Sequence, residues 1–377
     1  MYKKILVTLR TYNDVDHIVP IIWELLEKGH HVFVFGISNY DFSNDYRMKF
    51  IKNYKNIKIF LPYKENKFYK FLKYNIISIL IFLIINKIDS FVSEWKRPTF
   101  KGLWGQFFYA SKILGIVKIA VPHGYNVFLN HDVNDVVSKF RKRNPKILGD
   151  RNEFDYYVLA TDIQRDQAVE LGINQKIAIS LGSTRYSYKW HKILNTIERK
   201  TLNENSSTKT NICLMTPHWS YNVNKEETFK MIESISCIDD TVLFVKPHTR
   251  DSGNISNSEI NDFKDNVKYT TNETSHQLIS KTDIVITFGS SIIFEAILQN
   301  KYILNPKFLH TNQTIFDNEV SIYHADNIYE VIENIKMIKK NKPTKNKSEY
   351  ENILKKYVYN NSNTEPIDSY IKLITKN

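Results

Sequence analysis

The opening forty residues constrain the fold most, because they set out a strand, a helix and a second strand in close succession. Residues 5–9 form one uninterrupted apolar run, and residues 32–35 form another. Between them, apolar residues repeat at helical spacing from Ile18 to Leu26, and Gly29 marks the end of that helix. Two strands joined by one short helical crossover predict a parallel pair, and hence an α/β protein.

The same alternation continues along the chain and predicts two domains. A polar stretch at 201–210, TLNENSSTKT, is expected to be the linker between them, and 377 residues are enough for two domains. We predict an α/β protein of two Rossmann-like, doubly wound domains, residues 1–195 and 196–377, facing each other across a cleft. The further apolar strands on which this rests are expected at 57–61, 116–121, 155–160, 211–216, 241–245 and 283–288.

Charge and composition limit the partners. A net charge of +12 favours anionic partners, namely a nucleotide, a phosphorylated acceptor or an anionic membrane surface. Nucleic acid is not an expected partner, because no nucleic-acid recognition motif accompanies the charge. The basic stretch at 139–146 is read either as a solvated loop or as a membrane-facing patch, and the apolar run at 76–85, too short to cross a bilayer, as a buried helix or one at the membrane surface.

The two cysteines and the N-terminus bear on location. Neither cysteine belongs to a CxxC pair, and the N-terminal residues lack a signal-peptide pattern. We therefore expect a cytoplasmic protein that is peripheral at the inner face of the plasma membrane.

The segment at 283–296 carries the most informative motif. An apolar strand leads into Gly289, Ser290 and Ser291, and a helix follows. Backbone N–H groups and two hydroxyls at such a turn can bind a phosphate of a nucleotide donor, and Gly289 lets the backbone approach it closely. Glu295, one turn later, is a candidate to accept hydrogen bonds from a ribose or sugar hydroxyl. The alternative is that a serine only caps the helix.

A second motif follows the strand at 241–245. Lys246, His248 and Arg250 stand where that strand ends, which is where open parallel sheets bind ligands. Three cationic groups there would stabilise a departing phosphate, so these residues are expected to bind the donor phosphates.

The third and fourth motifs come earlier in the chain. His123 follows an apolar strand, and its imidazole is suited to take a proton from an acceptor hydroxyl; the alternative is a histidine that bonds only its own loop. Gly124, Asp14 and Asp16 are candidate contacts to that acceptor. Arg185, in the run Leu-Gly-Ser-Thr-Arg, either binds the nucleotide phosphates or holds the hinge between the domains.

Together these motifs resemble the GT-B superfamily and, within it, the CDP-glycerol glycerophosphotransferases of teichoic-acid synthesis. The resemblance implies that His123 is the base and that His248, Ser290 and Ser291 bind the donor phosphates. The sequence departs from that family at Pro122, where the family has a tryptophan, and at Pro247, which precedes His248 where the family has a proline after the histidine. CMP-sugar-dependent sialyltransferases and Kdo transferases of capsule synthesis share a similar pair of motifs. The residues that carry the resemblance are Pro122-His123-Gly124, Gly182 to Arg185, Lys246-Pro247-His248, and Ser290-Ser291 with Glu295.

The resemblance implies a metal-independent glycosyltransferase or glycerophosphotransferase without a cofactor, in which His123 and His248 are catalytic. The donor would be linked to CDP or CMP. The acceptor would be a polysaccharide or a lipid-linked molecule in capsule, teichoic-acid or lipopolysaccharide synthesis. No metal is expected, because cations and N–H groups can stabilise the leaving phosphate. Two alternatives remain, a UDP-sugar 2-epimerase-like isomerase and a non-catalytic protein that binds polysaccharide or the membrane surface.

Overall fold

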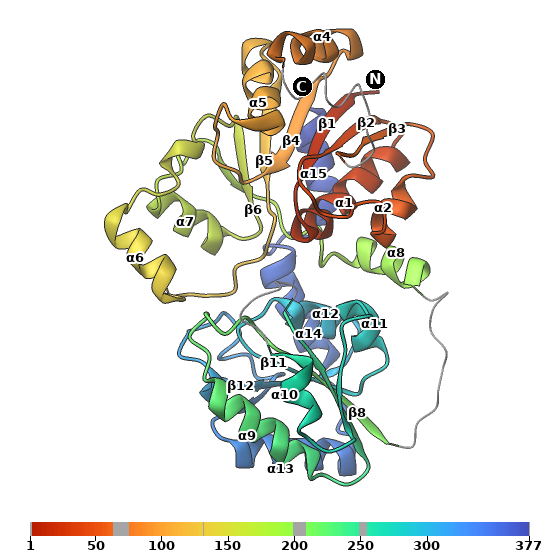
Figure 1. Cartoon of the computed structure of the whole chain (residues 1–377), viewed down its shortest axis with the longest axis vertical. Helices are drawn as coiled ribbons and strands as arrows, with labels where there is room; N and C mark the ends of the chain where they lie inside the picture. The colour runs from red at the N-terminus through yellow and green to blue at the C-terminus, as the bar shows by residue number, and fades with distance from the viewer. Residues whose placement is uncertain (1, 63–74, 131, 199–208, 249–254, 377) are drawn as a thin grey trace. The chain divides into compact units, whose positions relative to one another are not determined.

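The computed structural model describes residues 2–62, 75–130, 132–198, 209–248 and 255–376, and the chain divides into two compact units (Figure 1). Unit 1 consists of Met1–Tyr125, Asn144–Ile193 and Lys355–Asn377. Unit 2 consists of Asn126–Arg143 and Leu194–Leu354. Each unit is an α/β domain with its own parallel sheet, as the sequence predicts.

Seven parallel strands in the described part of unit 1 form a sheet in the order β3-β2-β1-β4-β5-β6-β7. The direction of winding reverses between β1 and β4, which pair with each other. Sheets of this kind bind ligands at the carboxyl ends of the strands around such a reversal. The strands are β1 Lys4–Leu9, β2 His31–Gly36, β3 Ile57–Phe60, β4 Ser90–Glu94, β5 Val117–Val121, β6 Tyr156–Leu159 and β7 Ala178–Ser180.

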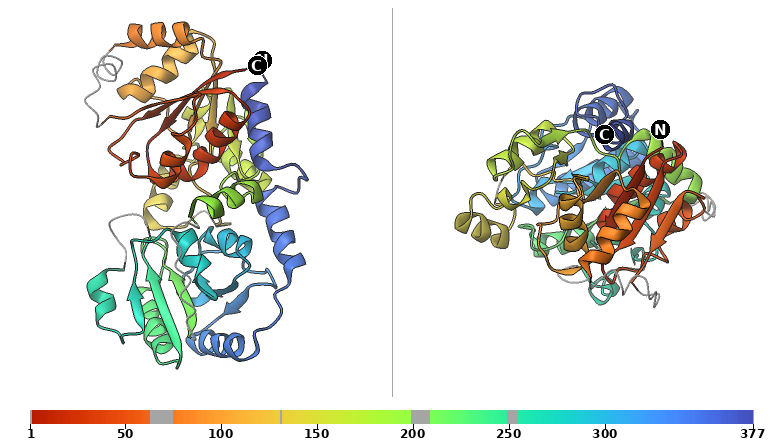
Figure 2. Two further views of the ribbon diagram at one scale, coloured as in Figure 1. Left: turned by 90° about the vertical axis from the view of Figure 1, so that its right-hand side faces the viewer. Right: turned by 90° about the horizontal axis from the view of Figure 1, so that it is seen from above.

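Helices cover both faces of this sheet (Figures 1 and 2). On one face, α4 and α5 pack together over strand residues that include Leu6, Phe35 and Phe91. On the other face, α1 packs against α2 and α15. The helices are α1 Tyr12–Glu27, α2 Tyr46–Ile51, α4 Ile76–Asn86, α5 Gly102–Ile113, α7 Asp162–Glu170 and α15 Pro366–Thr375, with α8 Tyr188–Glu198 running across the boundary between the units.

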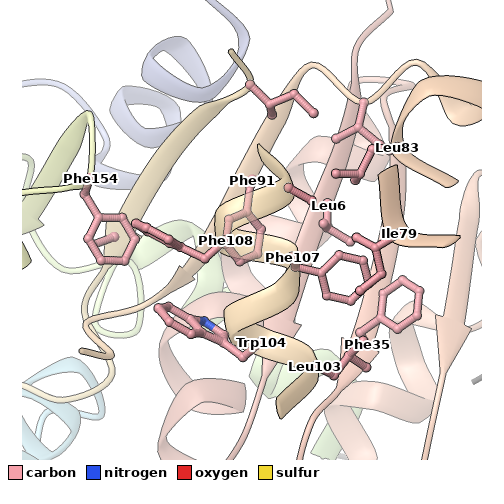
Figure 3. Packing of buried hydrophobic residues seen from close by; sticks show 14 of the residues in the cluster. Leu6, Phe35, Ile79, Leu83, Phe91, Leu103, Trp104, Phe107, Phe108 and Phe154 are labelled. Carbon is pink, nitrogen blue, oxygen red and sulfur yellow. The ribbon is translucent and has the colours of Figure 1, made fainter. Parts of the chain in front are cut away.

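Aromatic side chains fix α4 and α5 on the sheet (Figure 3). The ring of Phe35, on β2, lies 4.7 Å from the ring of Phe107 on α5 and 5.6 Å, edge to face, from that of Phe82 on α4. Ile79 and Leu83 of α4 are also buried in this cluster. One face of α4 is therefore part of the core, as one of the two readings of the run at 76–85 predicts.

Unit 2 repeats the plan with six parallel strands among its described residues, in the order β10-β9-β8-β11-β12-β13. Its winding reverses between β8 and β11. The strands are β8 Thr210–Met215, β9 Thr241–Lys246, β10 Val267–Tyr269, β11 Ile284–Thr287, β12 Tyr302–Pro306 and β13 Tyr323–Ala325. The helices are α6 Asp135–Arg143, α9 Lys225–Ser236, α10 Asn257–Asn261, α11 Ser275–Ser280, α12 Ile292–Leu298, α13 Ile328–Asn341 and α14 Lys347–Ile353.

Two segments belong to a different unit from the one that the predicted division at residue 195 assigns them to. The C-terminal helix α15 belongs to unit 1, because its apolar side chains pack on α1 and β4 and because the hydroxyl of Ser90 donates to the carbonyl of Ile374 at 2.9 Å. The segment 126–143 belongs to unit 2, where the N–H of Leu129 donates to the carbonyl of Gln313 at 2.9 Å. The remaining boundary, at 193/194, lies close to the expected position.

The basic stretch at 139–146 lies partly on α6, where Lys139, Lys142 and Arg143 are exposed. Among the helices of the described residues, none combines the length and hydropathy needed to cross a bilayer.

Candidate functional site

A charged cluster lies at the carboxyl edge of the unit 1 sheet, beside the reversal of winding. Glu94 ends β4 and is buried, at 2 % exposure. Its Oε1 accepts a hydrogen bond from Nε of Arg10, just after β1, at 2.6 Å, and its Oε2 lies 3.4 Å from Nδ1 of His123, just after β5. One buried carboxylate thus connects the ends of three neighbouring strands.

Aromatic rings hold the imidazole of His123. The ring of Trp95 meets it edge to face at 5.4 Å and stacks on Tyr157 at 5.6 Å. Nε1 of Trp95 donates to the carbonyl of Val158 at 2.8 Å, which fixes the indole. The side chain of His123 stays 36 % exposed. A partly exposed imidazole with one ring nitrogen facing a buried carboxylate is the arrangement of a general base.

Asp14 adds a second carboxyl group to this cluster. It occupies the third position of α1 and completes a capping box with Thr11, accepting hydrogen bonds from the N–H groups of Arg10 at 2.6 Å and Thr11 at 3.1 Å. Burial and the negative charge of Glu94 raise the pKa of Asp14 to about 6, although the contacts with Arg10 oppose the shift. A carboxyl group with that pKa can give or take a proton near neutral pH.

Two further basic side chains nearby have lowered pKa values, which favours their neutral forms. Burial, aided by the charge of Arg10, lowers the pKa of Lys96. Burial, with the charges of Arg185 and His123, lowers the pKa of His17 well below its usual value. His17 is a buried residue of α1.

The contacts of the other predicted residues of unit 1 do not point to a ligand. Arg185 contacts Asp16 at 3.0 Å, and Arg47 also pairs with Asp16, so the two candidates Asp16 and Arg185 bind each other. A side chain on Gly124 would meet no atom within 4 Å, so no close packing requires a glycine there. The acceptor role of Asp16 and Gly124 and the nucleotide role of Arg185 remain predictions.

Two histidines meet at the carboxyl edge of the unit 2 sheet. His218 follows β8 and His248 follows β9, and their rings meet edge to face at 6.2 Å. His218 also meets the ring of Tyr221 at 6.3 Å, and Tyr221 stacks on Phe128 at 5.8 Å. Nδ1 of His218 accepts a hydrogen bond from the N–H of Ser220 at 3.1 Å. These rings form a continuous row beside the reversal point of the second sheet.

The serine turn, defined as Gly289, Ser290 and Ser291, lies at the end of β11 beside this row. Gly289 has a φ of +59°, a conformation that favours glycine, and a side chain on it would lie 3.2 Å from the ring of Phe128. The hydroxyl of Ser290 accepts a hydrogen bond from the N–H of Ile292 at 3.3 Å, and Ser291 stands at the N-cap position of α12. Because α12 has only seven residues, any anion bound here would depend on side chains and nearby N–H groups more than on a helix dipole.

His310 adds a buried donor at the serine turn. Its ring stacks on Phe288 at 5.9 Å and is only 8 % exposed. Nδ1 accepts from the N–H of Asn312 at 3.1 Å, so the ring proton belongs on Nε2 when the imidazole is neutral, and burial lowers its pKa in favour of that form. Within the described residues Nε2 has no hydrogen-bond partner, and it lies 3.9 Å from where a side chain on Gly289 would begin. A buried N–H without an acceptor is costly, which indicates that a ligand or water accepts it.

Lys246 and Glu295 belong to a largely buried group of charged residues in unit 2. Nζ of Lys246 donates to the carbonyl of Glu273 at 2.6 Å, and burial lowers the pKa of Lys246. Glu295 is 7 % exposed and interacts electrostatically with Lys246 and His276. Burial alone would lower the pKa of His276. The hydrogen bond to Glu198 and the charges of Glu295 and Glu198 outweigh burial, so the pKa of His276 lies above its usual value. Arg250, another predicted phosphate ligand, lies outside the described residues.

The structure therefore brings Asp14 and His123 together around Glu94 in unit 1, and places His248 and the serine turn at the carboxyl edge of the unit 2 sheet. It also adds functional candidates that the sequence reading missed: Glu94, Lys96 and Trp95 in unit 1, and His218 and His310 in unit 2. A signal for His218 was present, because β5, β8 and β9 are all followed by Pro-His, at His123, His218 and His248. Among the described residues no three His, Cys, Asp or Glu side chains come together as metal ligands would.

Two Rossmann-like units of these topologies define the GT-B fold, and solved structures agree. No protein-family model matches the sequence, and no curated protein matches it. Similar structures include the UDP-GlcNAc 2-epimerase from Neisseria meningitidis bound to UDP-GlcNAc, at a TM-score of 0.62 and 13% identity over 99% of this chain and 100% of that one. A glycosyltransferase from Rickettsia africae has a TM-score of 0.62 and 13% identity, over 100% of this chain and 98% of that one. HepE from Anabaena, in complex with UDP-glucose, has a TM-score of 0.61 and 11% identity, over 99% of this chain and 100% of that one. These likenesses support the GT-B fold expected from the sequence and do not single out the glycerophosphotransferases.

Proposed function

We propose that this chain is an enzyme that acts on a nucleotide-activated sugar. The observation that carries the proposal is the Glu94–His123 pair, a histidine supported by a buried carboxylate at the reversal point of a parallel sheet. The group of His218, His248 and the serine turn at the matching place in unit 2 supports the nucleotide part. Structures of similar fold hold UDP-GlcNAc and UDP-glucose, which favours a uridine nucleotide over the cytidine nucleotide expected from the sequence.

The donor phosphates are assigned to unit 2. Ser290 and Ser291 offer hydroxyls, and the buried Nε2–H of His310 offers a donor that lacks an acceptor among the described residues. His218 and His248 would add N–H donors from the neighbouring strands. Donors preorganised around developing negative charge are the usual means of stabilising a leaving diphosphate without a metal.

Proton transfer is assigned to His123. Glu94 faces its Nδ1, which favours the tautomer in which Nε2 is the nitrogen that takes a proton, and Glu94 would stabilise the imidazolium that results. Asp14, with a pKa of about 6, is a second group able to exchange a proton near neutral pH.

Epimerisation of a UDP-sugar is the first candidate reaction. Inverting a ring carbon requires one proton to leave that carbon and another to return, so it needs more than one acid–base group, and Asp14, Glu94 and His123 supply such a set. Several structures of similar fold are UDP-GlcNAc 2-epimerases.

Glycosyl or polyol-phosphate transfer to an acceptor hydroxyl is the second candidate. It is favoured by a single imidazole oriented by a carboxylate, which suffices to deprotonate a hydroxyl. A glycosyltransferase is also among the structures of similar fold. The acceptor would then be a polysaccharide or a lipid-linked molecule, as the sequence resemblance implies.

Proton NMR of the reaction in D₂O tests both candidates. The protein is incubated with UDP-GlcNAc, and in parallel with other UDP-, CDP- and CMP-sugars, without an acceptor. An epimerase produces a second nucleotide sugar with deuterium at the inverted carbon, whereas a transferase leaves the donor unchanged until an acceptor is added. Failure of UDP, CDP and CMP to bind in calorimetry would exclude both enzymes and leave a non-catalytic binding protein.

A further inference from the structure

The outer face of α4 is exposed and entirely apolar. Ile77, Ile81, Ile84 and Ile85, here called the isoleucine row, are 50 to 71% exposed, while the opposite face of α4 is buried in the core. Their spacing of four, seven and eight residues places them on one side of the helix. Four large apolar side chains in an unbroken row are more than the scattered exposed residues that any soluble domain carries.

The two helices at the row carry no acidic residue of their own. Helices α4 and α5 pack side by side, and neither sequence contains Asp or Glu (Figures 1 and 2). Each helix leads into one of two adjacent parallel strands, β4 and β5, so the two helices end at the same edge of the sheet. Ile113, 65% exposed, and the exposed Lys112 lie at the end of α5, and the exposed Lys87 follows α4. The row therefore ends near another exposed isoleucine and two lysines, of which Lys112 also pairs with Glu153 at 2.7 Å.

Two partners could cover the isoleucine row, a second copy of the chain or a lipid surface, and the size of the row favours the lipid. An eleven-residue helix is about 16 Å long, so one of its faces falls far short of the about 800 Å² per partner that a stable protein interface buries. An apolar helix face with lysines at its end is instead typical of a helix lying in the headgroup region of a bilayer. The net charge of +12 favours anionic lipid.

We infer that the isoleucine row is a docking surface for an anionic lipid bilayer. Docking here brings unit 1 to the membrane and is independent of which reaction the protein catalyses. The two readings of the run at 76–85, given as alternatives from the sequence, would then both apply, because one face of α4 is core and the other meets lipid.

Sedimentation with lipid vesicles tests the inference. The full chain is mixed with vesicles of phosphatidylcholine alone or with phosphatidylglycerol added, at low and high salt. We expect binding to the anionic vesicles that weakens as salt rises. The variant Ile81→Gln/Ile84→Gln/Ile85→Gln, which keeps good helix formers at exposed positions, should lose about tenfold or more in vesicle affinity.

A matched control changes equally exposed apolar residues elsewhere. Val320 and Tyr329 of unit 2 are 82% and 73% exposed, so Val320→Gln/Tyr329→Gln should bind vesicles as the unchanged protein does. A thermal unfolding midpoint unchanged by the triple variant shows that its loss is not unfolding.

Three results would overturn the inference. The unchanged protein fails to bind anionic vesicles at low salt, or the triple variant binds as well as the unchanged protein. Alternatively, ultracentrifugation shows a dimer that the triple variant dissociates, in which case a second copy covers the row.

Discussion

Replacing Glu94 by Gln tests the proposed role of His123 as a general base most directly, because it keeps the shape of the side chain and removes the charge that faces His123. Two unit charges about 4 Å apart interact by about 4 kcal/mol at an effective dielectric of 20, and the 3.4 Å from Oε2 to Nδ1 gives slightly more. His123 is 36 % exposed, so solvent screens about half of this, which leaves about 2 kcal/mol of stabilisation for the imidazolium formed in the reaction. We therefore expect Glu94→Gln to lower kcat about thirtyfold.

A double-mutant cycle with His123→Ala shows whether Glu94 acts through the histidine. His123→Ala alone should lower turnover about a hundredfold or more, the usual effect of losing a positioned base. Adding Glu94→Gln to it should then cost little more, because the group that Glu94 supports is already missing. Nucleotide affinity, measured by calorimetry, should survive in all three variants, since the donor is assigned to unit 2.

Glu153→Gln is the control. Glu153 pairs with Lys112 at 2.7 Å on the same unit, and both side chains are exposed, so its loss should leave turnover unchanged. The reasoning is refuted if Glu94→Gln keeps turnover within about threefold of the unchanged protein, or if it lowers the activity of His123→Ala as much as it lowers that of the unchanged protein.

Three further predictions concern the serine turn, His310 and Asp14. Ser290→Ala/Ser291→Ala should weaken UDP binding in calorimetry by about tenfold with an unchanged unfolding midpoint; full affinity would remove the turn from the site. His310→Ala should weaken UDP but not uridine, because its Nε2–H is assigned to a phosphate; equal losses for both would contradict that. Since the folded pKa of Asp14 is raised from 3.8 to about 6, its carboxylate destabilises the fold above pH 6, and this cost, at most about 3 kcal/mol, disappears as pH falls toward 4. Asp14→Asn should remove that part of the pH dependence in urea unfolding, and an unchanged slope would contradict the shift.

Much of the fold follows from local patterns in the sequence. The strands β1, β2, β3, β5, β6, β8, β9 and β11 all coincide, to within a residue at either end, with the apolar runs from which they were predicted. The central strand β4 was missed, because Ser90, Ser93 and Glu94 make it look polar. Its polar groups are satisfied by distant parts of the chain, Ser90 by Ile374 and Glu94 by Arg10. No local pattern reveals such partners, so the strand and the buried carboxylate that it carries could not be inferred together.

Some residues of the candidate site could likewise be predicted from local sequence patterns, and others could not. His123, His248 and the serine turn follow recognisable strands, so their position at a sheet edge was predictable. Asp16 was proposed from its place near the first helix and Arg185 from its place in the Leu-Gly-Ser-Thr-Arg run. Their pairing depends on a fold that brings residues far apart in sequence together. His310 follows β12 with no strand pattern next to it in the sequence. It is identified by its buried Nε2, which lacks a hydrogen-bond partner in the described part of the chain.

The return of α15 to unit 1 affects how the protein is made. The chain passes from one unit to the other four times, and the helix that covers α1 and β4 is synthesised only after the whole of unit 2. Until then the apolar surface that receives Ile367, Ile371 and Ile374 faces water. During translation unit 1 therefore stays incomplete until unit 2 has been synthesised. Any dependence of this chain on chaperones is expected to fall within that interval.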